Sequence, residues 1–271
     1  MPVEIKQYEK ENMIIISKLF PKDWNFDFEK FISLHIDQKY FKGFTLSTNN
    51  EPIGFGNLLI FGEVGWIGNI VVKKTFRGKG LGTSITNHLI ETGKEAGVKT
   101  FILIATDLGE SLYKNIRFRT ELNYEFYKRS ESLKKFEISQ NIRVASKKDF
   151  KKIVDLDFAV SKEKRDEFLE LFLSRTKLIY NSTGKLKGLY IENLGNGLII
   201  ANEPDYGLEL LKVKLNTNGQ SVVIPETNLI AKDFLIKNRY KNYINAPRMI
   251  LGKKHNWKSE CVFSRGTGYC G

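Results

Sequence analysis

Between residues 69 and 85 the chain has the sequence NIVVKKTFRGKGLGTSI, which is its sharpest local feature. An apolar run ends at Val72, a basic glycine-rich turn follows, and a helical pattern starts at Leu81. The first N–H groups of a helix have no intrahelical acceptor, and the helix dipole gives them partial positive charge. Glycines permit positive φ and close approach of the backbone to an anion. The turn is therefore predicted to bind phosphate.

Two common phosphate-binding motifs do not fit this turn. G-x-x-x-x-G-K-[ST] is absent, which argues against a P-loop NTPase. The dinucleotide motif G-x-G-x-x-G fails because Thr83 stands where a third glycine should follow Gly78 and Gly80, and the next strand lacks the ribose-binding acidic residue. A turn that binds nothing is the remaining alternative. The cations Arg77 and Lys79 among three glycines weigh against it.

Strand and helix patterns alternate around the turn. Apolar runs bounded by turn residues predict strands, and the spacing of Leu81, Ile85 and Leu89 predicts a helix that ends before Gly97. The predicted order is strand, two helices, three strands, helix, strand, helix, strand. The ranges are 3–8, 9–19, 26–37, 43–47, 53–61, 65–72, 81–96, 100–105, 110–115 and 118–128.

The second half repeats this order more loosely, after a polar stretch at 128–141 that is predicted to be a linker or a connecting strand. IRVASKKDFKKIVDLDF (142–158) matches IKQYEKENMIIISKLF (5–20) locally, which indicates an internal duplication. Helices are predicted at 149–158, 164–174, 205–213 and 226–237. Strands are predicted at 142–146, 186–192, 198–201, 220–224, 243–251 and 257–263.

The turn R-G-K-G-L-G resembles the pyrophosphate-binding signature [QR]-x-x-G-x-[GA] of the GNAT acetyltransferases, with Arg77, Gly80 and Gly82 in its defined positions. Tyr113 and Phe118 match a second signature of the family, in which glycine is preferred where this chain has Arg117. The resemblance implies a mixed α/β fold with a GNAT domain at 1–130. It also implies a degenerate GNAT-like domain at 131–271, without its own acetyl-CoA site because 202–213 is acidic and lacks the arginine-glycine series.

The resemblance implies acetyl-CoA as the cofactor and coenzyme A as the product. The pantetheine arm is expected along backbone groups of Ile70, Val71 and Val72. Thr106 stands where many members of the family carry asparagine. The pyrophosphate is expected at the backbone amides of Arg77, Gly78, Lys79, Gly80, Leu81, Gly82 and Thr83.

The resemblance also implies direct attack by an amine, with Tyr113 as the general acid. A phenol stays protonated at neutral pH and is matched to a departing thiolate; packing of a short helix is the alternative role. A carboxylate could keep the amine neutral, and Glu63 is the best acidic candidate, although an exposed hairpin residue explains it more simply. Asn69 could orient a water or the substrate, or only bond backbone.

Composition limits the partners. The 271 residues carry a net charge of +12, with 41% apolar residues, and by our count +3 lies in 1–130 (18 − 15) and +9 in 131–271 (25 − 16). Asp157 and Arg165 could touch substrate, but solvated helix charges are the simpler explanation. Three scattered histidines lack zinc-like spacing, so no metal is expected. Without a signal peptide or a long apolar run, a cytoplasmic protein with no membrane partner is expected.

The sequence thus predicts an acyl-CoA-dependent N-acetyltransferase that acts on a primary amine of a small molecule or peptide. A non-catalytic acyl-CoA sensor or a nucleic-acid-binding module on the same fold is the alternative. Retention of Tyr113 favours catalysis, because a sensor does not need it. The acceptor and the oligomeric state stay open.

Overall fold

The computed structural model describes residues 2–24, 26–129, 135–218 and 221–270. The chain divides into two compact units. Unit 1 comprises Met1–Arg119 with Met249–Lys253, and unit 2 comprises Thr120–Arg248 with Lys254–Gly271. The predicted boundary at residue 130 stays a prediction, and the predicted linker at 128–141 falls partly outside the described residues.

Unit 1 is a mixed sheet with helices on both faces. Its strands follow the order β1-β2-β3-β4-β5, with the end of β12 beside β5. All neighbours from β1 to β4 are antiparallel, whereas β4 and β5 are parallel. The elements are β1 (Glu4–Gln7), α1 (Met13–Ser17), α2 (Phe28–His35), β2 (Phe41–Thr48), β3 (Glu51–Phe61), β4 (Val64–Val72), α3 (Leu81–Glu95), β5 (Thr100–Ile104) and α4 (Asp107–Asn115), with single 3-10 turns at Lys10–Asn12, Lys22–Trp24 and Lys74–Phe76.

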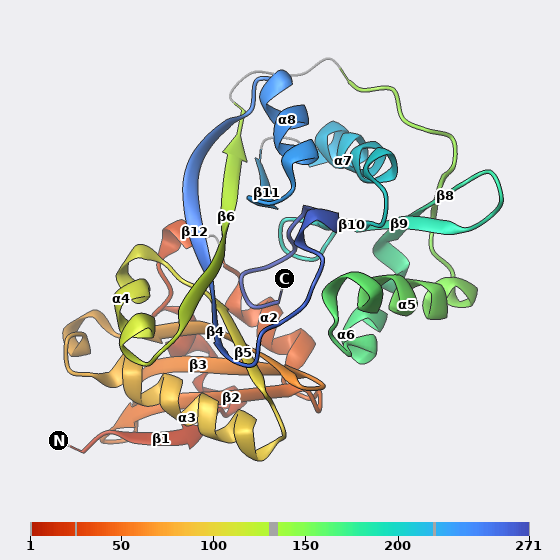
Figure 1. Cartoon of the computed structure of the whole chain (residues 1–271). Coiled ribbons are helices and arrows are strands. Elements are labelled where there is room, and N and C mark those ends of the chain that lie inside the picture. The colour runs from red at the N-terminus through yellow and green to blue at the C-terminus, as the bar shows by residue number, and fades with distance from the viewer. Residues whose placement is uncertain (1, 25, 130–134, 219–220, 271) are drawn as a thin grey trace. The chain divides into compact units, whose positions relative to one another are not determined.

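Local sequence explains how this sheet is built. Asn49 and Asn50 both take positive φ, which suits the tight turn between β2 and β3. Helix α3 packs on one face of β2, β3 and β4, while α1 and α2 lie on the other (Figure 1). Leu58 and Leu89 are fully buried between the sheet and α3. The sheet and α3 therefore hold β4 and the start of α3 in place.

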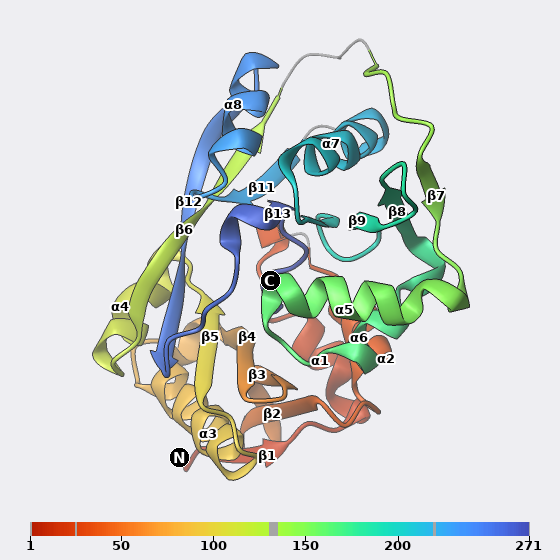
Figure 2. The same cartoon turned by 45° about the vertical axis from the view of Figure 1, so that its right-hand side comes forward.

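Unit 2 contains strands in two sheets. One follows the order β13-β10-β9-β8-β7, and β6 lies between β12 and β11 in the other. Figure 2 shows α5 and α7 on opposite sides of β9, which both helices contact. The elements are β6 (Arg119–Lys128), β7 (Ile142–Val144), α5 (Phe150–Ser161), α6 (Asp166–Glu170), β8 (Thr176–Tyr180), β9 (Leu186–Ile191), β10 (Leu198–Ala201), α7 (Pro204–Asn218), β11 (Ser221–Pro225), α8 (Leu229–Lys237), β12 (Lys241–Gly252) and β13 (Val262–Ser264), with 3-10 turns at Lys147–Asp149, Leu173–Arg175 and Ser259–Cys261.

The predicted mixed α/β class is confirmed, and several predicted elements differ in detail. Strand β8 was not predicted, because its five residues follow directly on a helical pattern. The strand predicted at 257–263 is shorter and begins at Val262, after a 3-10 turn. Helix α8 begins at Leu229, where the Asn228 side chain accepts a hydrogen bond from the Ala231 N–H. Capping geometry therefore sets a boundary that periodicity alone had placed three residues earlier.

Candidate active site

Strands β4 and β5 separate before they end. Their parallel pairing joins Val64 to Thr100, Gly65 to Phe101 and Trp66 to Ile102, and within the described residues this register stops there. We call the unpaired ends, residues 67–72 of β4 and 103–104 of β5, the fork. Ile70, Val71 and Val72 all lie on the fork. Backbone groups of the fork that face away from β3 are therefore available to a ligand, apart from the carbonyl oxygen of Val72, which accepts a hydrogen bond from Arg77.

The glycine-rich turn joins the fork to α3. Gly78 and Gly80 have φ of 74° and 75°, a region that glycine tolerates best, and a Cβ at either would meet nothing within 4 Å. Gly80 is the N-cap of α3, and no side chain among the described residues caps the helix there. The N–H groups of Leu81, Gly82 and Thr83 therefore have no intrahelical acceptor. Open space and unsatisfied donors suit an anion.

The two cations of the turn are held differently. Arg77 donates from Nε to the carbonyl oxygen of Val72 at 3.0 Å, which ties the turn to the end of β4. The Lys79 ammonium lies 5.2 Å from the centroid of the Phe76 ring. Lys73, by contrast, forms an ion pair with Glu51. Positive charge is thus retained beside the glycines.

Helix α4 brings Tyr113 to the same end of the parallel strands. A Cβ at Gly82 would lie 2.9 Å from Leu112, so the start of α3 packs against α4. Tyr113 is buried, and burial raises its pKa to about 12. Its ring meets Phe118 edge-on at 5.9 Å. The phenol therefore keeps its proton at neutral pH.

Two smaller residues mark the ends of these strands. Thr106 is the N-cap residue of α4, two residues beyond the end of β5, and its carbonyl oxygen accepts hydrogen bonds from the N–H groups of Gly109 and Glu110. Asn69 lies on the fork with φ of 56°, and its Nδ2 donates to Oδ1 of the buried Asn57 at 2.8 Å. Asn57 was not predicted. Its only sequence signal is a lone polar residue inside the apolar run of 53–61.

Glu63 lies at the opposite end of β4. It sits in the exposed link between β3 and β4, where its carboxylate pairs with Lys99 at 2.5 Å. Its carbonyl oxygen accepts the N–H groups of Lys99 and Thr100. Six residues of extended chain, about 20 Å at roughly 3.3 Å per residue, separate Glu63 from Asn69. The structure therefore does not bring Glu63 together with the other predicted catalytic residues.

The corresponding strands of unit 2, β10 and β11, have the chain itself between them. Strand β13 pairs antiparallel with β10, and Arg265 then donates its N–H to the carbonyl oxygen of Val223 on β11 at 2.7 Å. The ring of Phe263 lies directly against Gly207, in the first turns of α7, where a Cβ would clash with it. Segment 262–265 thus occupies the place that is open at the fork.

The link that precedes α7 also differs from the turn of unit 1. Only Asn202 and Glu203 separate β10 from α7, whereas residues 73–80 separate β4 from α3. Glu203 forms an ion pair with Lys187, and Asp205 lies in the first turn of α7. Acidic side chains at this helix start disfavour an anion.

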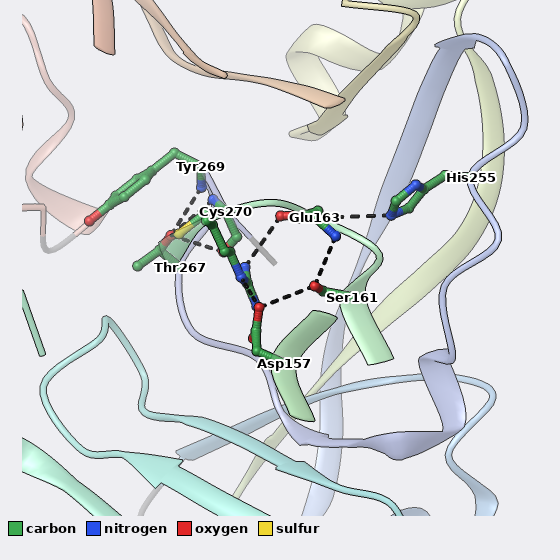
Figure 3. Close-up of polar contacts among 8 residues, drawn as sticks. Asp157, Ser161, Glu163, His255, Thr267, Tyr269 and Cys270 are labelled. Atoms are coloured by element: carbon green, nitrogen blue, oxygen red, sulfur yellow. Dashed lines mark hydrogen bonds and ion pairs between the residues drawn. The ribbon is translucent and has the colours of Figure 1, made fainter. Parts of the chain in front are cut away.

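Asp157 and Arg165 are not solvated helix charges, and that expectation is wrong. They are 1% and 3% exposed, and Arg165 donates to both carboxylate oxygens of Asp157, at 2.7 and 2.8 Å. Glu163 and Ser161 complete the network, with His255 3.9 Å from Glu163 (Figure 3). A bidentate pair with further hydrogen bonds offsets the cost of removing two charges from water.

Cys270 joins the edge of this network. Its Sγ lies 3.1 Å from Oγ1 of Thr267, and burial raises the pKa of the thiol to about 12. A thiol with this pKa is protonated at neutral pH and is not a nucleophile. The network therefore anchors the end of the chain within unit 2.

Comparison with known proteins identifies the fold of both units. The model of the Acetyltransferase (GNAT) family matches residues 6–118. A Bacillus subtilis protein named "Putative acetyltransferase" is 29% identical over 94 residues, which are 35% of this chain and 62% of that protein. The chain thus matches less than two thirds of that relative's length.

Two solved structures are similar over nearly the whole chain. A "Putative Acetyltransferase" from Pyrococcus horikoshii has a TM-score of 0.84 at 21% identity, over 99% of this chain and 96% of that one. A tandem GNAT protein from the clavulanic acid biosynthesis pathway has a TM-score of 0.62 at 10% identity, over 93% and 98%. At these identities the likeness concerns the fold. The family model thus covers residues 6–118 of the 271, and the two likenesses show that the chain has the fold of these proteins over nearly its whole length.

Proposed function

We propose that the protein is an N-acetyltransferase that transfers an acetyl group from acetyl-CoA to a primary amine of a small molecule or peptide. One observation carries the proposal. The fork and the glycine-rich turn meet at the same end of β4, where the Arg77 side chain bonds the last strand residue, Val72. A strand edge with free backbone groups and an anion site are therefore contiguous, as a ligand with an amide-bearing arm and a pyrophosphate requires.

The residues of this site fit acetyl-CoA. The open space beside Gly78 and Gly80 admits the pyrophosphate to the free N–H groups at the start of α3. Arg77 and Lys79 supply positive charge. Backbone groups of residues 70–72 suit the amides of the pantetheine arm, and Thr106 lies at the end of the neighbouring strand.

Bound there, acetyl-CoA supplies an acyl group activated as a thioester. Tyr113 holds a proton on its hydroxyl that is available to a sulfur leaving group, and its raised pKa keeps that proton in place across the neutral range. Asn69 offers an amide on the fork itself. Neither Cys261 nor Cys270 belongs to unit 1, which supports direct attack by the amine rather than a cysteine-bound acyl intermediate.

The general base stays open. Glu63 is the acidic candidate from the sequence, but its pairing with Lys99 and its place at the far end of β4 give that role no support. An acceptor that is already neutral needs no base, so we expect kcat/KM to rise with pH as the acceptor amine loses its proton. Glu63→Gln is expected to leave this profile unchanged.

A matched pair of glycine variants tests the cofactor site. Gly80 and Gly97 both have positive φ, and a Cβ at either would meet nothing within 4 Å, but they lie at opposite ends of α3. Gly80→Asp places a negative charge and a side chain at the proposed pyrophosphate site. We expect calorimetry to show at least a 100-fold loss of acetyl-CoA affinity in Gly80→Asp and less than a threefold change in Gly97→Asp. Equal affinities in the two variants would sink the assignment.

Turnover separates an enzyme from an acyl-CoA sensor. Coenzyme A release is measured with a panel of primary amines, amino acids and peptides. We expect Tyr113→Phe to lower kcat by about 100-fold or more, because the proton donor is lost, while acetyl-CoA affinity stays within threefold. Binding without release for every acceptor in the wild-type protein would favour the sensor.

We also propose that unit 2 has no acetyl-CoA site of its own. The segment between β10 and β11 and the acidic start of α7 support this. Calorimetry is expected to give one acetyl-CoA per chain. A second site that survives Gly80→Asp would contradict the proposal.

A further inference from the structure

Strand β4 carries a bulge at the fork. Its register with β3 pairs Phe55 with Val71 and Asn57 with Gly68, so both Asn69 and Ile70 stand opposite the single residue Gly56. Asn69 has φ of 56°, which is uncommon for a residue other than glycine. Bulges insert one residue into a strand and can redirect a side chain beside an active site.

The bulge turns Asn69 to the other face of the sheet. In a regular strand Asn69 would point away from the face of Gly68 and Asn57, because successive side chains alternate. Ile70 instead takes the α3 face, since its Cδ1 lies 2.5 Å from the position of a Cβ at Gly56. Asn69 bonds Asn57 at 2.8 Å and therefore shares the opposite face. The redirection occurs just past Trp66, where β4 leaves β5.

We call the hydrogen-bonded side chains of Asn57 and Asn69 the amide pair. Each has one polar atom that their mutual hydrogen bond does not use. Asn57 is fully buried, and its Nδ2 has no hydrogen-bond partner among the described residues. Asn69 uses its Nδ2 on Asn57, which leaves its Oδ1 as an acceptor. A buried donor without a partner is costly, so it points to a ligand or a bound water. The pair thus offers one donor, from Asn57 on β3, and one acceptor, from Asn69 on the fork.

We propose that this amide pair holds the acceptor substrate, with Asn57 as a positioning residue. Oδ1 of Asn57 fixes Nδ2 of Asn69, so that Oδ1 of Asn69 faces the acceptor and accepts a hydrogen bond from its amino N–H. Nδ2 of Asn57 donates to an oxygen of the same acceptor. The substrate class is therefore a primary amine with an uncharged hydrogen-bond-accepting oxygen close to the nitrogen. This inference rests on the proposed acetyl transfer.

A double-mutant cycle tests the positioning role. Asn69→Gly removes the amide but keeps the left-handed backbone of the bulge, and Asn57→Leu removes the group that holds it. Each is expected to lower kcat/KM for the amine about 10- to 100-fold, because small misplacements of a reacting group cost this much. Acetyl-CoA affinity should stay within threefold. The double variant should lose less than the product of the two single losses, since Asn57 acts partly through Asn69 and partly through its own donor.

A control on the same sheet face guards against a general packing effect. Thr45 of β2 is also buried, and its hydroxyl has no partner among the described residues. It pairs with Phe55 of β3. Thr45→Val is expected to change kcat/KM by less than threefold. Fold losses that multiply in the double variant, or an equal loss in Thr45→Val, would overturn the proposal.

The donor is tested with two acceptors of the same shape, 2-methoxyethylamine and butylamine, at rates per neutral amine. The wild-type protein is expected to prefer the ether at least 10-fold. Asn57→Asp keeps an oxygen for Asn69 and loses the donor, so its preference for the ether over butylamine should fall to about one. This variant serves as well if Asn57→Leu does not fold.

The outcomes separate the two proposals. If the wild-type protein acetylates amines and the Asn57 and Asn69 variants do so equally well, the amide pair does not hold the acceptor. The proposed acetyltransferase activity then still stands. If the wild-type protein does not prefer the ether, the Asn57 donor binds water. The proposal that the acceptor carries an oxygen near its amine is then wrong. Absence of any wild-type turnover removes both.

Discussion

The two repeats of this chain use the same order of elements and differ at one place. In unit 1, β4 and β5 part after Trp66, and a glycine-rich turn follows the fork. In unit 2, β13 and Arg265 hydrogen-bond to both of the corresponding strands, β10 and β11. An anion site therefore does not come with the fold alone. It needs an open strand end and a turn long enough to expose helix N–H groups.

One helix-sheet contact in each unit shows the same difference. Gly93 of α3 accommodates the ring of Phe101 from β5, and Gly207 of α7 accommodates the ring of Phe263 from β13. Both glycines make room for a phenylalanine where a Cβ would clash. In unit 1 the ring belongs to a strand of the sheet, whereas in unit 2 it belongs to the segment that fills the gap. Segment 262–265 is therefore part of the core of unit 2.

The largest effect is expected from Phe263→Ala. Removal of a fully buried ring leaves a cavity, and such changes lower the free energy of unfolding by about 3–5 kcal/mol. Denaturant unfolding measures this loss. Acetyl-CoA affinity should stay within threefold, because the fork belongs to unit 1. A gain of a second acetyl-CoA site in Phe263→Ala would break the comparison, since the segment would then cover a latent site.

Each unit also contains a buried neutral histidine. Burial lowers the pKa of His35 in unit 1 and of His255 in unit 2 to about 4, against 6.5 in the unfolded chain. The unfolded state therefore binds more protons below pH 6.5. The free energy of unfolding should fall from pH 6.5 to pH 4 by up to about 3 kcal/mol per histidine.

Urea unfolding at pH 7, 5.5 and 4.5 measures this slope. His255→Gln cannot titrate and should remove about half of the histidine contribution, as should His35→Gln. Below pH 4.5 carboxylates add their own dependence, so the comparison is made above it. An unchanged slope in either variant would mean that the histidine has the same pKa in the folded and the unfolded protein.

The smallest effect separates two helix caps. Asp27 accepts the Lys30 N–H at the start of α2 in unit 1, and Asn228 accepts the Ala231 N–H at the start of α8 in unit 2. Asn228 is also buried and donates to the carbonyl oxygen of Val262, the first residue of segment 262–265. Asp27→Ala should cost about 1 kcal/mol and Asn228→Ala about 2 kcal/mol. Equal losses would show that the bond to Val262 contributes nothing.

Part of the candidate site could be predicted because its signal is local. The turn at Arg77–Gly82 depends on residue types next to one another in the chain, and glycine φ and helix starts are local properties. The amide pair could not be predicted this way. Regular alternation along β4 would put the Asn69 side chain on the α3 face of the sheet. The bulge in the pairing of β4 with β3 turns it to the opposite face, where Asn57 lies. Register is a property of two strands, so it cannot be read from either one.

The burial of two charged residues, Asp157 and Arg165, also could not be predicted from their local sequence. Asp157 and Arg165 lie eight residues apart on either side of a helix end, and a charged helix surface was the simpler expectation. The chain beyond residue 254 lies beside them in unit 2, where His255 is 3.9 Å from Glu163 of the same network (Figure 3). Whether a charge is solvated is decided by which distant segment covers it.

The sequence by itself determined the mixed α/β class, the repeated order of elements and the glycine-rich turn, because periodicity and turn chemistry act over a few residues. Tertiary structure alone decided where β4 leaves β5, which face Asn69 takes and what fills the gap between β10 and β11. These depend on pairing between strands far apart in the chain, where one residue of register turns a side chain from one face to the other.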